Sequence, residues 1–554
     1  MNINPIQIAK EQIENVVIAA VDSNVDLPKF TIEKPANSAH GDFSTNAAMV
    51  WAKSLQNNPR AIATEIIENI KTDGTYISSA EIAGPGFINF RLHENFYTDL
   101  ASYIISKGVD FGKSAFGEEK RVLVEFVSAN PTGPMHIGNA RGGALGDGIA
   151  SALEWAGFNV SREFYINDAG NQLIKFGASL EARYLQIFDD SIEFPEDGYK
   201  GADITEHAEN FAKIHHDKYV NADENSRKQA LVEYALPLNV KRLEDNLERY
   251  RIIYDNWFKE SSLHKGGEVS QIIEKLKESG KTYEHEGALW LMSGDEQNPE
   301  EDFVVVRANG VPTYLAADIA YHYNKFVTRD YDVAINVLGA DHHGYKARLV
   351  AGMSALGLNN KQLDFKLTQM VRLIRGGEVI KSSKRTGKSI TLETLLDEIP
   401  LDAARYFFNL READTHLDFD LDLAIEESSK NPVYYVQYAH ARICSIIKNL
   451  AAEGIEIDKN ADLSLLNHET ERDLILKLAD FESEIIMAAQ SLEPAKIAKY
   501  VFDLAALFHK FYNAVKVRCD DLALSKARLL LCDCARIVIK NSLTILKVDA
   551  PEMM

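Results

Sequence analysis

Cysteine is scarce in this 554-residue sequence, and long apolar segments are absent. The four cysteines form no CxxC pair and have no histidine at zinc-ligand spacing, which excludes the common cysteine zinc sites and favours reduced, structural thiols. They are Cys444, Cys519, Cys532 and Cys534. We therefore expect no protein-bound structural metal. No run approaches the roughly 18 apolar residues of a membrane-spanning helix, and acidic residues precede the short apolar run 16–21, so we expect a cytoplasmic protein without a membrane association.

Positive charge is also in short supply. Sixty lysines and arginines stand against 82 aspartates and glutamates, for a formal net charge of −22. This balance argues against indiscriminate nucleic-acid binding by counterion release, so any RNA contact must use local basic patches. Hydrophobic residues at 46% and charged residues at 26% are typical of globular domains and exclude a fibrous or disordered chain. At roughly 150 residues per domain, the length predicts about three or four domains.

The N-terminal region mixes two periodicities. Helical patterns occur at 6–20, 46–55 and 61–70, and strand-like runs occur at 76–83 and 87–92. This mixture predicts a small α+β domain.

A nucleotide-binding α/β core is predicted next along the chain. Residues 121–127, RVLVEFV, have the nearly continuous apolar character of a buried parallel strand. A small-residue helix at 139–155 and a second strand at 160–166 complete a right-handed βαβ unit.

The remaining chain shows further shifts in pattern. Residues 195–300 are rich in charge and in loop signals, as expected of an insertion between the halves of the core. Strand patterns resume at 303–307, 333–338 and 364–371. From Leu401 onward the helical period dominates, which predicts a separate all-α domain.

His136-Ile-Gly-Asn139 comes after the first core strand and opens its helix, where an α/β sheet binds phosphates and nucleotides. The helix contains four glycines: Gly142, Gly143, Gly146 and Gly148. Each costs about 1 kcal/mol relative to alanine inside a helix, which indicates close approach by a flat group or another backbone. Tight packing of the helix on its sheet is the simpler explanation, and a structural hydrogen bond is the simpler role for His136.

A second segment, Lys381-Ser-Ser-Lys384-Arg385, lies about 245 residues later and closes the same α/β region. Two lysines three residues apart can contact adjacent phosphates and neutralise charge on a departing pyrophosphate. Such a loop by itself is more often merely solvated, so its position relative to His136 carries the argument.

Together the two segments resemble the paired HIGH and KMSKS signatures of class I aminoacyl-tRNA synthetases. Asn139 replaces a histidine and cannot titrate, while Ser382 and Arg385 replace the methionine and the final serine. The resemblance implies a Rossmann-like core that binds ATP with Mg²⁺. It implies catalytic roles for His136, Asn139, Lys381 and Lys384, and ATP contacts from these four residues, Gly138 and Ser383.

Longer segments resemble arginyl-tRNA synthetases of the bacterial type. They include HGDFSTNAA at 40–48, AGPGFINF at 83–90, VEFVSANPTGPMHIGN at 124–139, REFYINDAGNQ at 162–172, GVPTYLAADIAYH at 310–322, DAARYFF at 402–408 and NPVYYVQYAHARI at 431–443. The resemblance implies an arginine–tRNA ligase, which converts L-arginine and ATP to arginyl-adenylate and transfers arginine to the 3′-terminal ribose of tRNA(Arg), releasing AMP and pyrophosphate. It further implies a monomer and an activation step that requires bound tRNA.

The same resemblance assigns the domains. Residues 1–111 would form an additional tRNA-binding domain, and 112–400 a class I catalytic core with an insertion at about 195–300. Residues 401–554 would form the α-helical anticodon-binding domain.

Arginine selectivity has a physical signature, because a guanidinium presents a planar fork of donors that carboxylates match. By resemblance the arginine site comprises Glu125, Ser128, Asn130, Tyr314, Asp318 and His342, with Asp341 nearby. Without the family, Asp318 could equally be an exposed carboxylate at a helix start. His342 and His343 are adjacent, so their rings diverge and we expect no metal site there.

By resemblance the anticodon meets the C-terminal helices. The residues are Tyr434, Gln437, Tyr438, His440, Arg442, Tyr512 and Arg518. Bases splayed from an RNA loop are read by aromatic stacking and edge hydrogen bonds. Packing between helices is the alternative for about half of them.

Two other functions fit parts of the sequence. A cofactor adenylyltransferase of the HIGH type would be shorter and would not need the α-helical tail. A synthetase-like RNA-binding protein without catalysis is disfavoured by the retained lysines and by Glu125 and Asp318. Pyrophosphate exchange with each amino acid distinguishes these alternatives.

Overall fold

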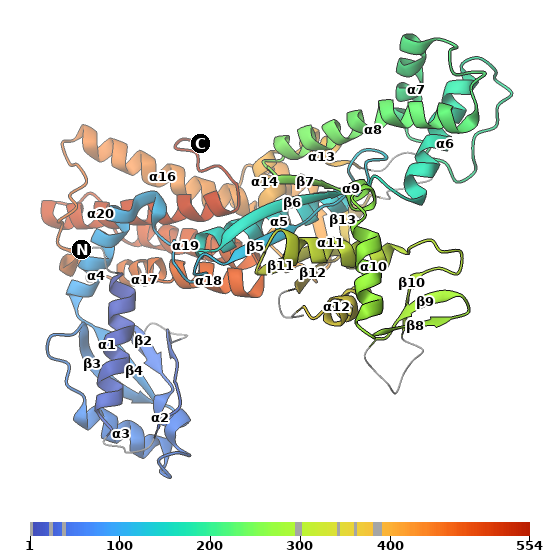
Figure 1. The fold of residues 1–554 in the computed structure, drawn as a ribbon. Coiled ribbons are helices and arrows are strands. Elements are labelled where there is room, and N and C mark those ends of the chain that lie inside the picture. Colours follow the sequence, from blue (N-terminus) through green and yellow to red (C-terminus); the bar gives the residue numbers. More distant parts are fainter. Residues whose placement is uncertain are drawn as a thin grey trace.

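The computed structural model describes residues 4–21, 26–35, 40–293, 302–340, 344–358, 363–380 and 390–554. Figure 1 shows a parallel sheet at the centre, the C-terminal helices packed beside it, the N-terminal region below those helices and a helical arm that projects from the opposite end. Lys381, Ser383, Lys384, Asp341 and His342 lie outside the described residues.

The N-terminal region is α+β, as the sequence predicts. Its antiparallel sheet has the order β1-β2-β4-β3. In the first helix, Pro5 occupies the first turn and the Asn4 side chain accepts a hydrogen bond from the Ile6 amide, so the helix begins at a favourable cap. The elements are α1 (Pro5–Ala19), β1 (Ile32–Glu33), β2 (Phe43–Thr45), α2 (Ala47–Trp51), α3 (Pro59–Asn69), β3 (Ile77–Ala83), β4 (Phe87–Leu92), α4 (Glu94–Lys107) and η2 (Gly108–Asp110).

The central sheet is entirely parallel and has the order β12-β11-β5-β6-β7. Its strands are β5 (Arg121–Glu125), β6 (Asn159–Ile166), β7 (Asn256–Lys259), β11 (Val333–Gly339) and β12 (Leu363–Thr368), and α5 (Ile137–Trp155) connects β5 to β6. The predicted βαβ unit is therefore present. Strand order reverses at β5, between β6 and β11, and ligands bind beyond the carboxyl ends of strands at such a switch point.

Three strand predictions differ from the structure. Strand β7 lies inside the predicted insertion and forms the sheet edge, with Trp257 stacked on Phe164 at 4.4 Å between ring centroids. The predicted run 364–371 spans two strands, because β12 ends at Thr368 and the next strand begins at Val371, and neither Gln369 nor Met370 between them is a glycine or proline that would signal the break. The predicted strand 303–307 pairs outside the central sheet.

Two smaller units flank the core. The arm has its own apolar core, and an antiparallel sheet of order β10-β9-β8 lies near the other flank (Figure 1). The arm comprises α6 (Asn171–Gln186), α7 (Ala202–His215) and α8 (Glu224–Arg249). The second unit and its neighbours comprise α9 (Glu260–Lys265), α10 (Glu268–Glu278), β8 (Thr282–His285), β9 (Ala288–Leu291), β10 (Phe303–Val306), α11 (Tyr314–Tyr323), the π-helical η4 (Asn324–Thr328) and α12 (Tyr345–Ala355).

The C-terminal part is helical apart from one strand. Strand β15 (Leu417–Asp420) pairs in parallel with β13 (Val371–Arg375), which also pairs with β14 (Glu378–Val379). The chain after Leu401 is therefore not purely α-helical, because a four-residue strand is too short to interrupt the helical pattern. The helices are α13 (Leu392–Glu398), α14 (Leu401–Phe408), α15 (Leu421–Ile425), α16 (Pro432–Ala452), η8 (Leu463–Leu465), α17 (Glu469–Leu478), α18 (Phe481–Ser491), α19 (Ala495–Ala514) and α20 (Leu522–Ile545).

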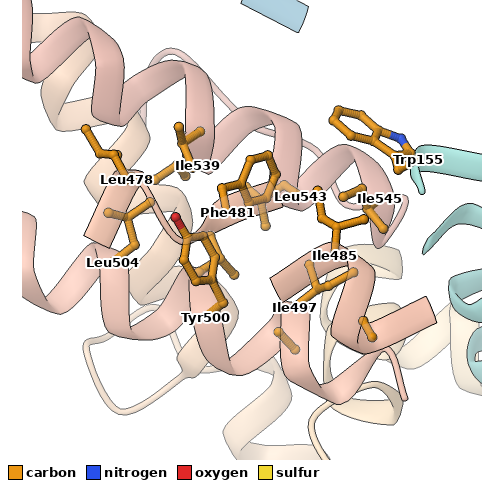
Figure 2. Packing of buried hydrophobic residues seen from close by; sticks show 14 of the residues in the cluster. Trp155, Leu478, Phe481, Ile485, Ile497, Tyr500, Leu504, Ile539, Leu543 and Ile545 are labelled. Carbon is orange, nitrogen blue, oxygen red and sulfur yellow. The ribbon is translucent and has the colours of Figure 1, made fainter. Parts of the chain in front are cut away.

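The core of these helices is continuous with the core around α5 of the parallel sheet. Figure 2 shows Phe481 with Tyr500 and Trp155, at centroid distances of 5.4 and 6.2 Å. Since Trp155 ends α5, one continuous apolar cluster links the nucleotide-binding helix to the C-terminal helices. None of the helices in the described ranges combines the length and apolar character needed to span a bilayer.

The glycines of α5 are explained by packing. A Cβ atom at Gly146 would lie 2.3 Å from Cγ of Phe126, and one at Gly148 would lie 2.9 Å from Cβ of Pro494. A Cβ at Gly142 would meet no atom within 4 Å. The close approach is thus to side chains of the core, as expected if the helix simply packs tightly on its sheet.

We expect Gly146→Ala to destabilise the protein by about 1–3 kcal/mol, because the base of the Phe126 ring cannot move away from the added methyl group. Gly142→Ala is the matched control in the same helix. It should be neutral or stabilising by up to about 1 kcal/mol, since alanine favours helix and the space is open. Thermal unfolding of the two variants measures the difference, and equal melting temperatures would contradict this packing.

Candidate functional site

A cavity of about 1180 Å³ opens beyond the carboxyl ends of β5 and β11, at the point where the strand order reverses. Seven of the residues predicted from the sequence line it: Glu125, Ser128, Asn130, His136, Asn139, Tyr314 and Asp318. Gly138, in the first turn of α5, does not line the cavity, and a Cβ atom built on it would meet no atom within 4 Å. Residues more than 190 positions apart therefore meet at one sheet edge.

The turn after β5 is strained. Val127 and Ser128 have φ values of 69° and 43°, in the left-handed region where a β-branched residue is rarely found. Strain of this kind costs about 1–3 kcal/mol per residue and concentrates at functional sites. It ends the strand at Glu125 and turns Ser128 back, so its hydroxyl donates to Glu125 Oε1 at 3.2 Å and accepts from the Tyr165 amide at 3.3 Å.

His136 is the N-cap residue of α5, and the first turn of α5 faces the same cavity. The Ile137 amide donates to the Ile390 carbonyl at 3.3 Å, and the Leu392 amide donates to the Met135 carbonyl at 2.9 Å. The segment that comes soon after Lys381–Lys384 in sequence is thus hydrogen-bonded to the segment around His136. Residues 390–392, which follow the second predicted signature in sequence, therefore lie beside the first one.

The arm forms the other wall of the cavity. Its residues that line the cavity include Lys200 from the loop before α7, Asp203 from α7 and Arg242 from α8. The Asn239 side chain donates to the Pro131 carbonyl at 3.0 Å, which connects α8 to the loop after β5. Arg242 also pairs with Glu393 at 2.7 Å.

Five carboxylates line the cavity: Glu125, Asp318 and Glu260 lie on the sheet side, and Asp203 and Glu206 lie on the arm. Glu260 was not predicted from the sequence, although it is the first residue after the edge strand β7, and a carboxylate at a strand's carboxyl end is itself a signal. Asp318 is half-buried among the cavity walls and is therefore not an exposed carboxylate at a helix start.

Burial raises the pKa of two of these groups, Asp318 and Glu260. Burial raises the pKa of Asp318 to about 7, aided by the negative charges of Glu260 and Glu125 and opposed by a hydrogen bond from Tyr345. Burial also raises the pKa of Glu260, which accepts a hydrogen bond from the Tyr165 hydroxyl. Carboxyl groups held in this way become better acceptors for a cation that replaces their protons.

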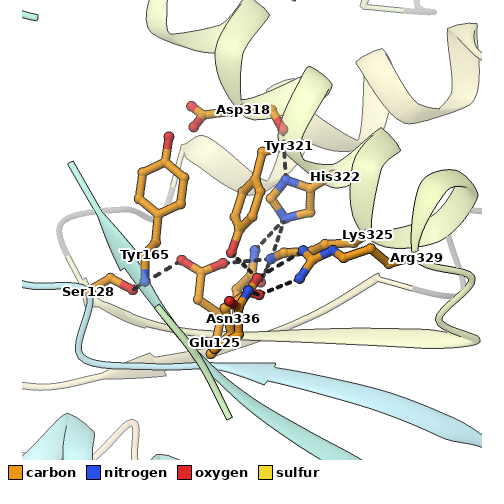
Figure 3. A network of polar contacts seen from close by, with 11 residues as sticks. Glu125, Ser128, Tyr165, Asp318, Tyr321, His322, Lys325, Arg329 and Asn336 are labelled. Carbon is orange, nitrogen blue, oxygen red and sulfur yellow. Dashed lines mark hydrogen bonds and ion pairs between the residues drawn. The ribbon is translucent and has the colours of Figure 1, made fainter. Parts of the chain in front are cut away.

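Glu125 is not an unpaired carboxylate, contrary to what its predicted role suggests. Its Oε2 atom lies 2.6 Å from Nζ of Lys325, whose side chain has no exposed surface. Figure 3 shows this pair within a polar network that includes His322 and Asn336. Lys325 was not predicted from the sequence because it lies just beyond the segment that resembles the family.

The predicted anticodon residues separate into two groups. Arg442 lies 4.9 Å from the centroid of the Tyr438 ring and 5.0 Å from that of Tyr512, and Tyr434 stacks on Tyr438 at 6.3 Å. These four half-buried side chains form one aromatic and cationic cluster. Arg518 is exposed and pairs with Glu453 at 3.1 Å.

Gln437 and His440 are instead tied to the chain terminus. Gln437 donates to the Asp402 side chain at 2.8 Å and to the Asp549 carbonyl at 2.9 Å. His440 is buried, and its Nδ1 donates to the Pro551 carbonyl at 2.9 Å. A direct base contact by His440 is therefore corrected to a packing role.

Comparison with known proteins gives consistent matches along the chain. Residues 7–92 match the family described as "Arginyl tRNA synthetase N terminal domain", residues 100–447 match "tRNA synthetases class I (R), catalytic domain", and residues 436–554 match "DALR anticodon binding domain". An arginine–tRNA ligase of Ruminiclostridium cellulolyticum is 53% identical over 98% of this chain and 99% of its own length.

Two further comparisons cover the full length. An arginine–tRNA ligase of Caldanaerobacter subterraneus subsp. tengcongensis is 52% identical over 100% of both chains. The structure of Thermus thermophilus arginyl-tRNA synthetase matches with a TM-score of 0.76 at 22% identity, over 98% of this chain and 100% of that chain. At that identity the match shows the shared fold.

The raised pKa of Asp318 predicts a pH-dependent stability. Because its pKa is about 7 in the folded protein and 3.8 in a model peptide, its contribution is fully present below pH 4 and is lost as the pH rises through 7. Relative to Asp318→Asn, the wild-type protein should lose roughly 2–3 kcal/mol of stability between pH 5 and pH 8. Thermal unfolding of both proteins at each pH tests this, and an unchanged difference would show that Asp318 is ionised throughout.

Proposed function

Because this chain belongs to the class I arginyl-tRNA synthetases, which are ATP-dependent arginine–tRNA ligases, we propose that the cavity beyond β5 and β11 binds arginine and ATP side by side. The enzyme activates L-arginine as arginyl-adenylate and transfers it to the 3′-terminal ribose of tRNA(Arg). The convergence of Glu125, Asp318 and Glu260 on one cavity supports the arginine assignment most directly.

The guanidinium group binds between Asp318 and Glu260. Within the described part of the chain, neither carboxylate has a buried lysine or arginine partner like that of Glu125, and each holds its proton more tightly than usual. A guanidinium can replace those protons and donate planar hydrogen bonds to both groups. Glu125, compensated by Lys325, lies with Ser128 and Asn130 at the strand end and receives the amino-acid end of the substrate.

The adenylation step needs positioning more than a base. The arginine carboxylate is already ionised, and its attack on the α-phosphorus releases pyrophosphate. His136 and Asn139 at the start of α5 hold the phosphates, where the helix N-terminus favours negative charge. Lys381, Ser383 and Lys384, which lie outside the described residues, neutralise the departing pyrophosphate.

Mg²⁺ enters with ATP. In the described ranges no group of three or more histidine, cysteine, aspartate or glutamate side chains forms a cage for a metal ion. Mg²⁺ keeps several waters and commonly binds through substrate phosphates, so the phosphates of ATP would supply most of its anchorage.

The tRNA spans the molecule. The cluster of Tyr434, Tyr438, Arg442 and Tyr512 stacks with anticodon bases, and Arg518 adds positive charge nearby. The N-terminal region, 1–111, contacts the outer corner of the tRNA, and the arm wall of the cavity faces its 3′ end. The enzyme functions in the cytoplasm as a monomer.

Asp318→Asn and Glu260→Gln should each weaken arginine binding by at least about 2 kcal/mol, or roughly 30-fold in KM, because a charge-assisted pair is lost. The KM for ATP should change less than about twofold. ATP–pyrophosphate exchange with tRNA present measures both values, and exchange with each amino acid should single out arginine. Glu274→Gln, an exposed carboxylate paired with Lys277, is the control. Unchanged arginine KM in both variants would sink the proposed pocket.

Tyr438→Ala should raise the KM for tRNA by roughly 5- to 150-fold, corresponding to about 1–3 kcal/mol for one stacked base. Arginine and ATP kinetics should remain unchanged. Ser445→Ala is the control in the same helix, since its hydroxyl only donates back to the Ala441 carbonyl at 3.0 Å and its loss should leave tRNA kinetics unaltered. If a folded Tyr438→Ala protein shows wild-type aminoacylation kinetics, Tyr438 only packs between helices and does not contact the anticodon.

A further inference from the structure

The face of α11 and η4 that points to the sheet carries a series of polar groups. Asp318, Tyr321, His322, Lys325 and Arg329 recur at helical spacing and appear together in Figure 3. The series continues through the π-helical segment η4, and π-helical turns in α-helices are frequent at functional sites. Only the first of these groups was expected to bind substrate.

Lys325 occupies the middle of this series and is completely buried. Its Nζ atom donates to Glu125 Oε2 at 2.6 Å and to Asn336 Oδ1 at 3.1 Å, and it lies 4.1 Å from the centroid of the Tyr321 ring. An isolated buried ammonium group would be strongly unfavourable, and so would the carboxylate without its partner. Removing either Lys325 or Glu125 alone would therefore leave an unfavourable buried charge on the other residue.

His322 orients the pair without adding charge. Burial and the neighbouring Lys325 lower the pKa of His322 well below its usual value, so the ring is neutral at neutral pH. Its Nδ1 donates to the Asp318 carbonyl at 2.8 Å, which leaves Nε2 to accept from Asn336 Nδ2 at 2.7 Å. The backbone of Asp318 is thereby joined to Glu125 through a chain of hydrogen bonds in which Lys325 donates in both directions, to Asn336 and to Glu125.

A second ion pair faces the same helical segment from β6. Glu163 accepts from the Tyr321 hydroxyl at 2.5 Å and from Arg329 Nη2 at 3.0 Å. Glu163 does not line the cavity. It is neutralised by Arg329, so the charge that Lys325 supplies goes to Glu125.

The charge count of the cavity depends on Lys325. Without it, Glu125 would join Asp318 and Glu260 as a third uncompensated carboxylate on the sheet side of the cavity, in addition to Asp203 and Glu206 on the arm side. Carboxylates that share a site resist simultaneous ionisation. With it, Glu125 is held by the Lys325 ammonium group at 2.6 Å, and Asp318 and Glu260 remain for the guanidinium. Lys325 reaches this effect without lining the cavity itself.

We propose that Lys325 is a specificity-determining positioning residue, which acts through Glu125 to leave arginine two uncompensated carboxylates and one fixed, compensated acceptor. The inference rests on the proposed arginine pocket. It assigns a role in substrate selection to a buried side chain that contacts neither arginine nor ATP.

Lys325→Met tests the proposal, because methionine retains the volume and removes the charge. The kcat/KM for arginine should fall at least tenfold, while the KM for ATP stays within about twofold. Lowering the pH from 8 to 6 should raise the arginine KM more steeply than in the wild-type enzyme, with about one additional proton released on binding, because Glu125 then titrates together with Asp318 and Glu260. ATP–pyrophosphate exchange with tRNA present gives these values.

Arg329→Met is the matched control, since it removes the cation of the Glu163 pair on the same helical face. It should lower the melting temperature but leave the arginine KM and its pH dependence as in the wild-type enzyme. If Lys325→Met behaves in the same way as Arg329→Met, the Lys325 pair is structural and the proposal is overturned.

A double-mutant cycle keeps the test decisive if Lys325→Met folds poorly. In the Glu125→Gln background, position 125 carries no carboxylate that the loss of Lys325 could leave without a partner. Lys325→Met should therefore be tolerated there and should change the arginine KM by less than about twofold. If Lys325→Met lowered the kcat/KM for arginine in that background as much as it does in the wild-type enzyme, Lys325 would not act through Glu125. The arginine KM of Asp318→Asn, which is measured outside this cycle, shows whether the proposed arginine pocket fails or only the proposed role of Lys325 fails.

Discussion

The ion pair between Lys325 and Glu125 is the constraint on which the site depends. Burying two charges is unfavourable unless their remaining hydrogen-bonding positions are filled, and here Asn336, Ser128 and the Tyr321 ring fill them. The pair draws groups from β5, β11 and the helical segment of α11 and η4 to one point. Since α11 also carries Tyr314 and Asp318, the same contact sets how far these side chains stand from the strand ends.

The helix α5 connects the cavity region to the rest of the molecule through buried ion pairs. Its Asp147 is buried between Arg162 of β6 and Arg405 of α14, at 2.9 and 2.5 Å. Arg405 also donates to the Leu546 carbonyl, at the end of α20, at 3.0 Å. The middle of α5 and the C-terminal helices α14 and α20 thus share one buried network.

Much of the site was predictable because its residues lie in motifs of fixed spacing. Glu125 ends a buried strand and Asn130 and His136 come soon after it, and the carboxyl ends of parallel strands meet at one edge of the sheet. Asp318 was predicted only through the resemblance, and its half-buried position shows why a helix pattern could not place it. Glu260 comes directly after a strand of four residues within charged sequence. A strand that short does not show enough alternation of apolar and polar residues to be predicted.

The sequence by itself determined the order of the α+β, α/β and helical regions and the βαβ unit, and through the resemblance it predicted two phosphate-binding signatures and a guanidinium pocket. These depend on local periodicity and on residue types within short segments. Tertiary structure alone decided which carboxylates are compensated, because Lys325 lies 200 residues from Glu125 and their contact depends on the register of β5 beside β11. It also decided that His440 packs against the chain terminus while Tyr438 joins the aromatic cluster. The physical reason is that ionisation, burial and hydrogen-bond pairing are properties of the neighbourhood in space, which distant segments create only when they fold together.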